Sequence, residues 1–347
     1  MIIGIIVEFN PFHNGHKHLI DNIKKKYPNS TLIAIMSSDI VLRGDLSIIS
    51  KFDRAKIALE NGIDLVFSMN PESSLNAAHE FAKNSITHLN KLGIEKLIFG
   101  SESNNIEKLI KISNEISKKE KEISQLREKE KISYNQAVNK LFSYELKPND
   151  ILAVEYIKNI NLINKSIKFE SIKRIESDTL GSASLVRKSI HNKKFKTKIN
   201  NISYKKYEIR NLEDFNDLFK YKLSTDNSSD SKKETDKYFN FIKNNYDSSI
   251  NYWKWVNNNS LKNITTSSLR RASIKKLFNI DKNENKYIRL LSCSNKGKKY
   301  LKTIDNNLYF SKFDKSMKSE LLISKVLEIK YKGTVKKEIN FKVISSN

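Results

Sequence analysis

Short apolar runs alternate with helical stretches along the first half of the chain. Each run has the length of a β-strand and is rich in Ile, Val and Phe. The runs occupy residues 2–7, 32–36, 63–67, 96–99 and 167–172. Residues 16–26 and 52–61 lie between runs and carry apolar side chains at helical spacing. Because strands that are joined through helices must pair in parallel, the pattern predicts an α/β fold with a Rossmann-like, doubly wound parallel sheet.

A strongly charged segment and a polar segment divide the rest of the chain. Residues 103–145 predict a helical insertion that begins with one long helix over 103–131, whose Glu and Lys side chains are typical of a solvated face. A further helix is predicted at 151–160, after the Pro148 that punctuates its start. The chain turns polar near residue 193, and residues 222–237 have the composition of a linker. We therefore predict a first domain over 1–195 and a basic, mainly helical second domain over 196–347.

Cysteine content, hydropathy and charge indicate where in the cell the protein acts and what kind of partner it binds. The single cysteine, Cys293, excludes a disulfide within the chain and a cysteine-based zinc site. The chain has no apolar run of about eighteen residues, and its apolar start lacks a basic leader and a cleavage site, so we expect a cytoplasmic protein. The formal net charge of +24 favours an RNA partner. An AT-rich genome would produce the same excess of Lys and Asn, which leaves a basic surface in solvent or at membrane headgroups as the alternative.

The segment Ile5-Ile-Val-Glu-Phe-Asn-Pro-Phe-His-Asn-Gly-His16 joins a strand, a turn and the start of a helix. His13 and His16 could donate hydrogen bonds to phosphate oxygens, and Gly15 lets a ligand approach without a β-carbon in the way. The amino terminus of the helix adds free N–H groups, so the segment predicts a triphosphate site for nucleotidyl transfer. A metal site competes with this interpretation, but no Asp or Cys stands at ligand spacing from the two imidazoles. Two surface histidines without a role are the third possibility.

His13-Asn-Gly-His16, with Asn10-Pro-Phe12 before it, resembles the signature of the HxGH nucleotidyltransferase superfamily. Further landmarks resemble a narrower family, the bacterial tRNA(Met) cytidine acetate ligases, and the resemblance spans roughly residues 1–190. These landmarks are Met36-Ser37, Arg43-Gly44, Ser50-Lys-Phe-Asp-Arg54, Phe99-Gly-Ser-Glu-Ser103, Pro148-Asn-Asp-Ile-Leu152, Glu155-Tyr156, Lys173-Arg-Ile175 and Ser182-Ala-Ser-Leu-Val-Arg187.

The resemblance implies a two-step ligase reaction. ATP and acetate would form acetyl-adenylate, and the acetyl group would pass to N4 of the wobble cytidine of elongator tRNA(Met). His13 and His16 would be catalytic, and the turn around Ser182 and Ser184 would hold the outer phosphates. The remaining ATP contacts would be Val7, Glu8, Phe9, Asn10, Pro11, Phe12, Asn14, Gly15, Gly100, Asn149, Arg174 and Ile175. Mg²⁺ is expected with the triphosphate, whereas no protein metal ligand, membrane contact or stable protein partner is predicted.

The segment 37–45 departs from the family pattern. Ser38, Asp39, Leu42 and Asp45 stand where the family has Gly, Asn, Gln and Glu. An Asp in place of Asn changes a neutral donor into an anion, which would disfavour an acetate or a phosphate beside it. Arg43 and Lys51 are the candidate contacts for such an anion, and surface salt bridging is the competing interpretation.

The second domain offers weaker signals. Tyr252, Trp253 and Trp255 lie among basic residues, a pattern that suits stacking on RNA bases and equally suits a helical core. Two other functions therefore stay open at this point. One is a small-molecule nucleotidyltransferase that makes a cofactor or lipid precursor, and the other is a relative that binds tRNA but has lost catalysis.

Overall fold

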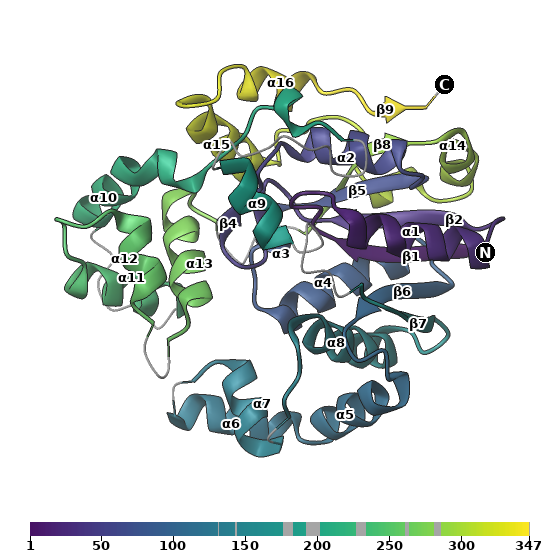
Figure 1. Ribbon diagram of the computed structural model, residues 1–347, viewed down its shortest axis with the longest axis horizontal. Coiled ribbons are helices and arrows are strands. Elements are labelled where there is room, and N and C mark those ends of the chain that lie inside the picture. Colours follow the sequence, from purple (N-terminus) through teal and green to yellow (C-terminus); the bar gives the residue numbers. More distant parts are fainter. Residues whose placement is uncertain are drawn as a thin grey trace.

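The computed structural model describes residues 1–130, 132–142, 144–175, 183–191, 202–226, 234–260, 264–280 and 286–346. Within these residues a seven-stranded sheet has the order β7-β6-β1-β2-β5-β8-β9 (Figure 1). Its strands are β1 (Ile2–Val7), β2 (Thr31–Met36), β5 (Leu65–Met69), β6 (Lys96–Ser101), β7 (Lys168–Lys173), β8 (Ile288–Cys293) and β9 (Ile344–Ser345). All neighbours pair in parallel except β5 and β8, and a small antiparallel ladder joins β3 (Ile40–Val41) to β4 (Asp45–Leu46). The predicted doubly wound parallel sheet is confirmed.

The central strands are apolar on both faces because helices cover both faces. In β2, Ile33 and Ile35 join one core, while Leu32, Ala34 and Met36 join the other. Alternation of side chains along a strand produces this division, and burial of both faces explains the continuous apolar runs in the sequence. The first core lies against α4 (Ala78–Lys91), α5 (Ile106–Lys118) and α8 (Pro148–Ile163). The second lies against α1 (Asn14–Lys26), α2 (Lys51–Glu60) and α9 (Ala183–His191).

The charged insertion contains shorter helices than the sequence predicts. The expected helix over 103–131 is broken at Lys119 into α5 and α6 (Glu120–Glu130), and α7 (Tyr134–Phe142) follows. The apolar side chains of this segment also pack inward, since Ile112, Ile116 and Ile123 are at most 2% exposed. Only one side of these helices is therefore the solvated face that their charge suggests. The short helix α3 (Pro71–Ser74) follows β5.

Helices dominate the chain after residue 202, as predicted. They are α10 (Asn216–Thr225), α11 (Glu234–Asn245), α12 (Tyr252–Asn258), α13 (Thr266–Leu277), α14 (Asn295–Leu301), α15 (Lys318–Glu328) and α16 (Thr334–Asn340), with 3-10 helices at Tyr204–Lys206, Leu212–Phe215 and Asn306–Leu308. Tyr252, Trp253 and Trp255 are buried in an aromatic core with Phe219. The core interpretation of these three residues is the correct one, because their rings are not available to stack on an RNA base.

Two strands of the sheet, β8 and β9, were not expected from the sequence. Strand β8 pairs antiparallel with β5, so residues far beyond position 195 complete the sheet. An antiparallel strand can join a sheet edge without a crossover helix, and the alternation of strands and helices therefore gives no sign of it. The boundary near residue 195 stays a prediction. No described helix is both long and apolar enough to cross a membrane.

Candidate active site

A cavity of about 740 Å³ opens at the carboxyl ends of β1, β6 and β7, where ligands bind in doubly wound sheets. It brings together most of the site residues that the sequence predicts. These are Val7, Glu8, Phe9, Asn10, His13, Gly15, His16, Arg43, Gly100, Asn149, Arg174, Ile175 and Ser184. Pro11 and Phe12 are instead buried beneath the turn, Asn14 is exposed at the start of α1, and Ser182 lies outside the described residues.

The turn between β1 and α1 is held by hydrogen bonds from residues distant in the sequence. Arg54 donates from Nη1 to the Glu8 carbonyl at 2.6 Å, and Arg187 donates from Nη1 to the Asn10 carbonyl at 2.6 Å. The Tyr204 hydroxyl donates to the carbonyl of Phe12 at 2.7 Å. Each of these bonds satisfies a carbonyl that a turn leaves without a partner. Three separate segments therefore fix the backbone that presents the two histidines.

His13 and His16 form a reciprocal cap at the start of α1. The backbone N–H of Gly15 donates to Nδ1 of His13 at 3.1 Å, and the N–H of His13 donates to Nδ1 of His16 at 3.2 Å. The ring centroids lie 3.9 Å apart. Because Nδ1 of each ring accepts a hydrogen bond, the proton of each neutral ring resides on Nε2. Both residues line the cavity, so the pair offers two Nε2–H donors at a helix amino terminus.

Burial keeps both imidazoles neutral. Desolvation, together with the nearby charges of Arg174 and Arg187, lowers the pKa of His13 to about 4. Desolvation and the neighbouring His13 lower the pKa of His16 well below its ordinary value. A neutral ring can donate from Nε2 while its Nδ1 still accepts, whereas an imidazolium could not accept. At neutral pH each ring can therefore accept its capping hydrogen bond at Nδ1 and still donate a hydrogen bond to a phosphate oxygen from Nε2.

The charge of the cavity wall suits a polyanion. Among the described residues, one carboxylate, Glu8, lines the cavity together with five cationic side chains, which are Arg43, Lys173, Arg174, Arg187 and Arg271. Burial raises the pKa of Glu8 above its ordinary value, against the opposing effects of the hydrogen bond from the Leu42 N–H and the charge of Arg54. An array of this kind stabilises negative charge on phosphate oxygens and stabilises the extra charge that develops during transfer.

The far side of the cavity is bounded by the ends of β6 and β7. At Gly100 an added β-carbon would lie 3.3 Å from Cγ of Arg174, so a side chain here would crowd that arginine. Arg174 donates from Nη1 to Oδ1 of Asn149 at 3.4 Å, and Asn149 donates from Nδ2 to Oε1 of Glu102 at 2.5 Å. These contacts orient a guanidinium and an amide toward the space beside Gly100. The arrangement fits a planar base that lies against bare backbone, as the sequence predicts for ATP.

Helix α13 and the insertion supply cavity residues that the sequence analysis did not assign. Thr265, Ser268 and Arg271 line the cavity from the start of α13, and Tyr134 lines it from α7. Arg270, the neighbour of Arg271, pairs with Asp45 at 2.8 Å across the same contact. The segment Thr265-Thr-Ser-Ser-Leu-Arg-Arg271 has no local pattern that assigns it to the site. Its position opposite the histidines depends on tertiary packing and could not be read from spacing.

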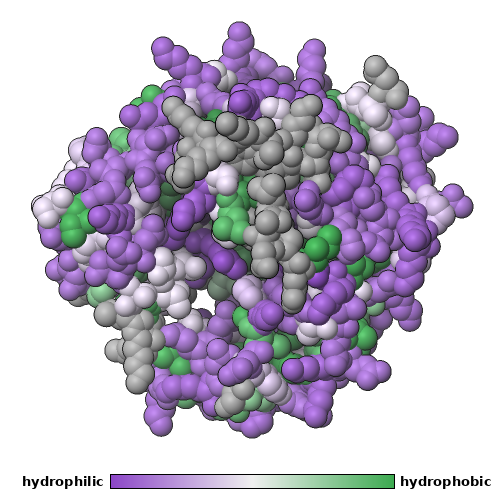
Figure 2. Space-filling view, in the orientation of Figure 1, coloured by the Kyte–Doolittle hydropathy of each residue, from purple (hydrophilic) through white to green (hydrophobic). Residues whose placement is uncertain are grey.

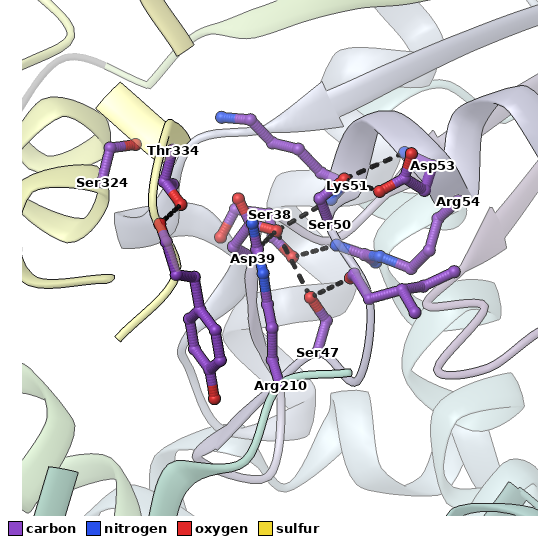
Figure 3. Close-up of polar contacts among 12 residues, drawn as sticks. Ser38, Asp39, Ser47, Ser50, Lys51, Asp53, Arg54, Arg210, Ser324 and Thr334 are labelled. Carbon is purple, nitrogen blue, oxygen red and sulfur yellow. Dashed lines mark hydrogen bonds and ion pairs between the residues drawn. The ribbon is translucent and has the colours of Figure 1, made fainter. Parts of the chain in front are cut away.

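The structure corrects the expected roles of Asp39 and Lys51. Asp39 is buried and accepts hydrogen bonds at 2.8 Å from Nη1 of Arg210 and from the backbone N–H of Lys51 (Figure 3). Burial alone would raise the pKa of Asp39, but the charges of Arg210, Lys51 and Arg54 outweigh it, and the pKa lies below its ordinary value. The Lys51 ammonium lies 3.0 Å from carboxylate oxygens of both Glu320 and Glu338. Neither side chain lines the cavity, and the charges of both are engaged in buried ion pairs.

Among the described residues, no three His, Cys, Asp or Glu side chains lie close enough together to hold a metal ion. Within the part of the chain that the structure describes, Glu8 is the one carboxylate in the cavity wall. A divalent cation in this cavity would therefore take most of its ligands from phosphate oxygens and water, which is how Mg²⁺ is commonly bound with nucleotides.

A doubly wound sheet with a histidine-capped helix in a cationic cavity defines the class of HxGH nucleotidyltransferases. The sequence matches the family described as HIGH Nucleotidyl Transferase over residues 1–344. It is 39% identical to the tRNA(Met) cytidine acetate ligase of Fusobacterium nucleatum over 334 residues, which cover 86% of this chain and 84% of that protein. It is 33% identical to the enzyme of the same name from Mycoplasma mobile, with 81% of this chain and all of that protein covered. The chain belongs to the tRNA(Met) cytidine acetate ligase family.

Solved structures agree with this fold. The crystal structure of Thermotoga maritima TmcAL without ligand superposes with a TM-score of 0.79 at 22% identity, and 99% of each chain is covered. The structure of the same protein bound with alpha-thio ATP gives a TM-score of 0.78 at 22% identity, with the same coverage. These likenesses establish that the whole described chain, including β8 and the helical region, follows one known architecture.

Proposed function

We propose that this protein is an ATP-dependent ligase that activates acetate as acetyl-adenylate and acetylates N4 of the wobble cytidine of elongator tRNA(Met). The carrying observation is the histidine pair His13 and His16, capped at a helix amino terminus and facing five cationic side chains. Family membership supplies the substrates, since relatives that share most of their length with this chain are tRNA(Met) cytidine acetate ligases. ATP and tRNA are cytoplasmic substrates, so the proposed reaction takes place in the cytoplasm.

In the first step an acetate oxygen attacks the α-phosphorus of ATP, the bond to the bridging oxygen breaks, and pyrophosphate leaves. The α-phosphate gains negative charge as it becomes five-coordinate, and the Nε2–H groups of His13 and His16 are the donors we assign to it. Arg187 and Ser184, both on α9, line the cavity and are suited to the outer phosphates. The protein contributes position and electrostatics, and no covalent enzyme intermediate is required.

Mg²⁺ is expected to accompany the triphosphate. It would neutralise part of the phosphate charge, while the cationic wall of the cavity neutralises the rest. We assign the side chains at this cavity as hydrogen-bond donors to phosphate oxygens. Because no group of carboxylates that could hold a metal ion lies among the described residues, we assign no protein side chain to Mg²⁺. The carboxylate of Glu8 is half-buried, accepts a hydrogen bond from the Leu42 N–H and lies close to Arg54, and these contacts give it a structural role.

The activation step can be tested alone by acetate-dependent exchange of labelled pyrophosphate into ATP, without RNA. We expect exchange by the purified protein, and His16→Ala should abolish it while tRNA affinity stays within about twofold, because one neutral donor contributes little to RNA binding. His191→Ala is the matched control, since His191 is exposed on α9 and does not line the cavity. Exchange that requires no acetate, or that survives His16→Ala, would contradict the proposal.

A further inference from the structure

A second, smaller cavity adjoins the proposed ATP site. It has a volume of about 190 Å³ and lies where α4, the insertion and helices α11 and α13 meet. Figure 2 shows the surface hollowed in this region, between the helical lobe of α10 to α13 and the sheet side of the molecule. Five residues line both cavities and so form their common boundary, namely Ala77, Ser133, Tyr134, Ser268 and Arg271. The small cavity, called the side cavity below, is therefore a neighbouring chamber of the same cleft.

The lining of the side cavity has the chemistry of a nucleotide site. Its described lining contains three cationic side chains, Arg127, Arg271 and Lys275, and one carboxylate, Glu80. The rings of His79 and Tyr134 are stacked with centroids 4.5 Å apart, and they form an aromatic wall. Cationic groups beside a planar aromatic surface are the combination that recognises a base together with its phosphate.

Arg127 contributes a guanidinium to the wall of the side cavity. Its guanidinium carbon lies 5.8 Å from the centre of the Tyr134 ring, and its Nε is buried with no hydrogen-bond partner among the described residues. The carbonyl O2 and ring N3 of cytosine are acceptors that suit a guanidinium in the cavity wall, whereas N4 must remain directed at the acyl group.

The two cavities differ in volume, and they therefore suit ligands of different size. A volume of about 190 Å³ corresponds to roughly six water molecules at about 30 Å³ each, which is room for one six-membered base and not for a nucleoside triphosphate. The larger cavity of about 740 Å³ has the volume of a typical ligand site and contains the histidines. The transfer step needs both substrates at once, with the acceptor base next to the α-phosphate.

We infer that the side cavity binds the acceptor cytidine of the RNA, flipped out of its loop. This inference rests on the proposed function and extends it to a site for the second substrate. The base enters between α7 and α13, and its N4 amine reaches the acyl carbon across the boundary formed by Tyr134 and Arg271. A C–N bond forms, the acyl C–O bond to the phosphate breaks, AMP leaves with the bonding electrons, and one proton is released from N4. Extrusion of a base from an RNA loop is the usual way in which enzymes reach a buried reactive atom.

Two substitutions at residues that line the side cavity but not the ATP cavity test this inference. Arg127→Ala removes a cation from the wall of the side cavity, and Ala272→Leu adds volume from α13 without a change of charge. Neither residue lines the ATP cavity. We expect each variant to lower kcat/KM for tRNA acetylation at least about tenfold, while acetate-dependent pyrophosphate exchange stays within about twofold of the unmodified protein. Unchanged exchange also shows that the variant is folded.

The controls are Lys129→Ala, an exposed cation on the same helix as Arg127, and Ala272→Ser, which adds little volume. Both should acetylate tRNA at the normal rate. Acetylation that is normal in both test variants would refute the inference, and so would a parallel loss of exchange and acetylation. Absence of acetate-dependent exchange in the unmodified protein would instead refute the proposed function itself. Tritiated acetate and tRNA from a strain that lacks the protein serve as the probes.

Discussion

Replacement of Lys51 by methionine tests the buried charge cluster that joins the end of the chain to α2. The Lys51 ammonium lies 3.0 Å from Glu320 and 3.0 Å from Glu338, and Arg289 lies 2.5 Å from Glu338 and 3.8 Å from Glu320. All four side chains are at most 2% exposed. Loss of one cation leaves two buried carboxylates to share Arg289, and removal of one partner from such a cluster costs about 3–5 kcal/mol.

This free energy converts into a measurable shift of the melting temperature. An unfolding entropy of about 2.1 cal/mol/K per residue gives roughly 0.7 kcal/mol/K for the 347 residues of the chain. Lys51→Met should therefore lower Tm by about 4–7 °C near pH 8, as followed by circular dichroism. Lys56→Met is the matched control, because Lys56 is exposed on the same helix, and it should move Tm by less than about 1 °C.

The loss of stability in Lys51→Met should depend on pH. Burial, and the neighbouring charge of Glu320, raise the pKa of Glu338 to about 7 against the opposing effect of Lys51. A raised pKa means that the folded state holds a proton that the unfolded chain releases, so this stabilisation is complete below the ordinary carboxyl pKa and is lost as pH rises through about 7. Without Lys51 the uncompensated charge is greater, and the Tm deficit should be larger near pH 8 than near pH 5.5.

Two results would refute this account of Lys51. One is a melting temperature within about 1 °C of the unmodified protein near pH 8. The other is no recovery in the double variant Lys51→Met with Glu338→Gln, which removes one charge of each sign and should restore about half of the loss or more. Below its melting temperature Lys51→Met should also keep the normal KM for ATP. A tenfold increase in that KM would restore Lys51 as a ligand contact.

Three further predictions follow from the geometry. Gly44→Ala should destabilise the protein by more than Gly333→Ala. Both glycines have positive φ, 75° and 83°, but only at Gly44 would the new β-carbon meet backbone, at 2.6 Å from the Arg271 nitrogen. Thermal melts of the two variants measure the difference. Tyr204→Phe and Tyr300→Phe each remove a 2.7 Å bond to a carbonyl and should each cost about 1–2 kcal/mol, but only Tyr204→Phe should raise the KM for ATP. The acidic limb of kcat/KM for ATP should lie near pH 4 and not near 6.5, because burial lowers the pKa of His13 to about 4 and also lowers that of His16. Because the folded state then binds fewer protons than the unfolded chain, folding stability should rise with pH from about 4 to 6.5.

The sheet and its motif could be predicted because their signals are local. Periodicity of apolar residues identifies strands and helices one at a time, and the segment around His13 carries its own strand, turn and cap. Asp39 and Lys51 were misassigned for the opposite reason. Their partners, Arg210, Glu320 and Glu338, are far away in the sequence, so the local pattern showed charges near a motif but not the buried pairs that neutralise them.

The same limit applies to the walls of the cavity. Arg271 and Tyr134 reach the site through the packing of α13 and α7, and strand β8 joins the sheet at an edge that needs no helical crossover. No local sequence pattern indicates the position of these two side chains at the site or the pairing of β8. The side chains that bind a triphosphate could therefore be predicted near the strand ends, whereas those that close the cavity from the helical region required the structure.

The most direct test of the account is incorporation of labelled acetate into tRNA. The purified protein is incubated with acetate, ATP, Mg²⁺ and total tRNA from a strain that lacks it, and the digested RNA is examined for N4-acetylcytidine. We expect the label in that nucleoside, in elongator tRNA(Met), with strict dependence on ATP and on His16. Binding of ATP without any labelled N4-acetylcytidine would contradict the ligase function and would favour a small-molecule nucleotidyltransferase or a tRNA-binding relative without catalysis.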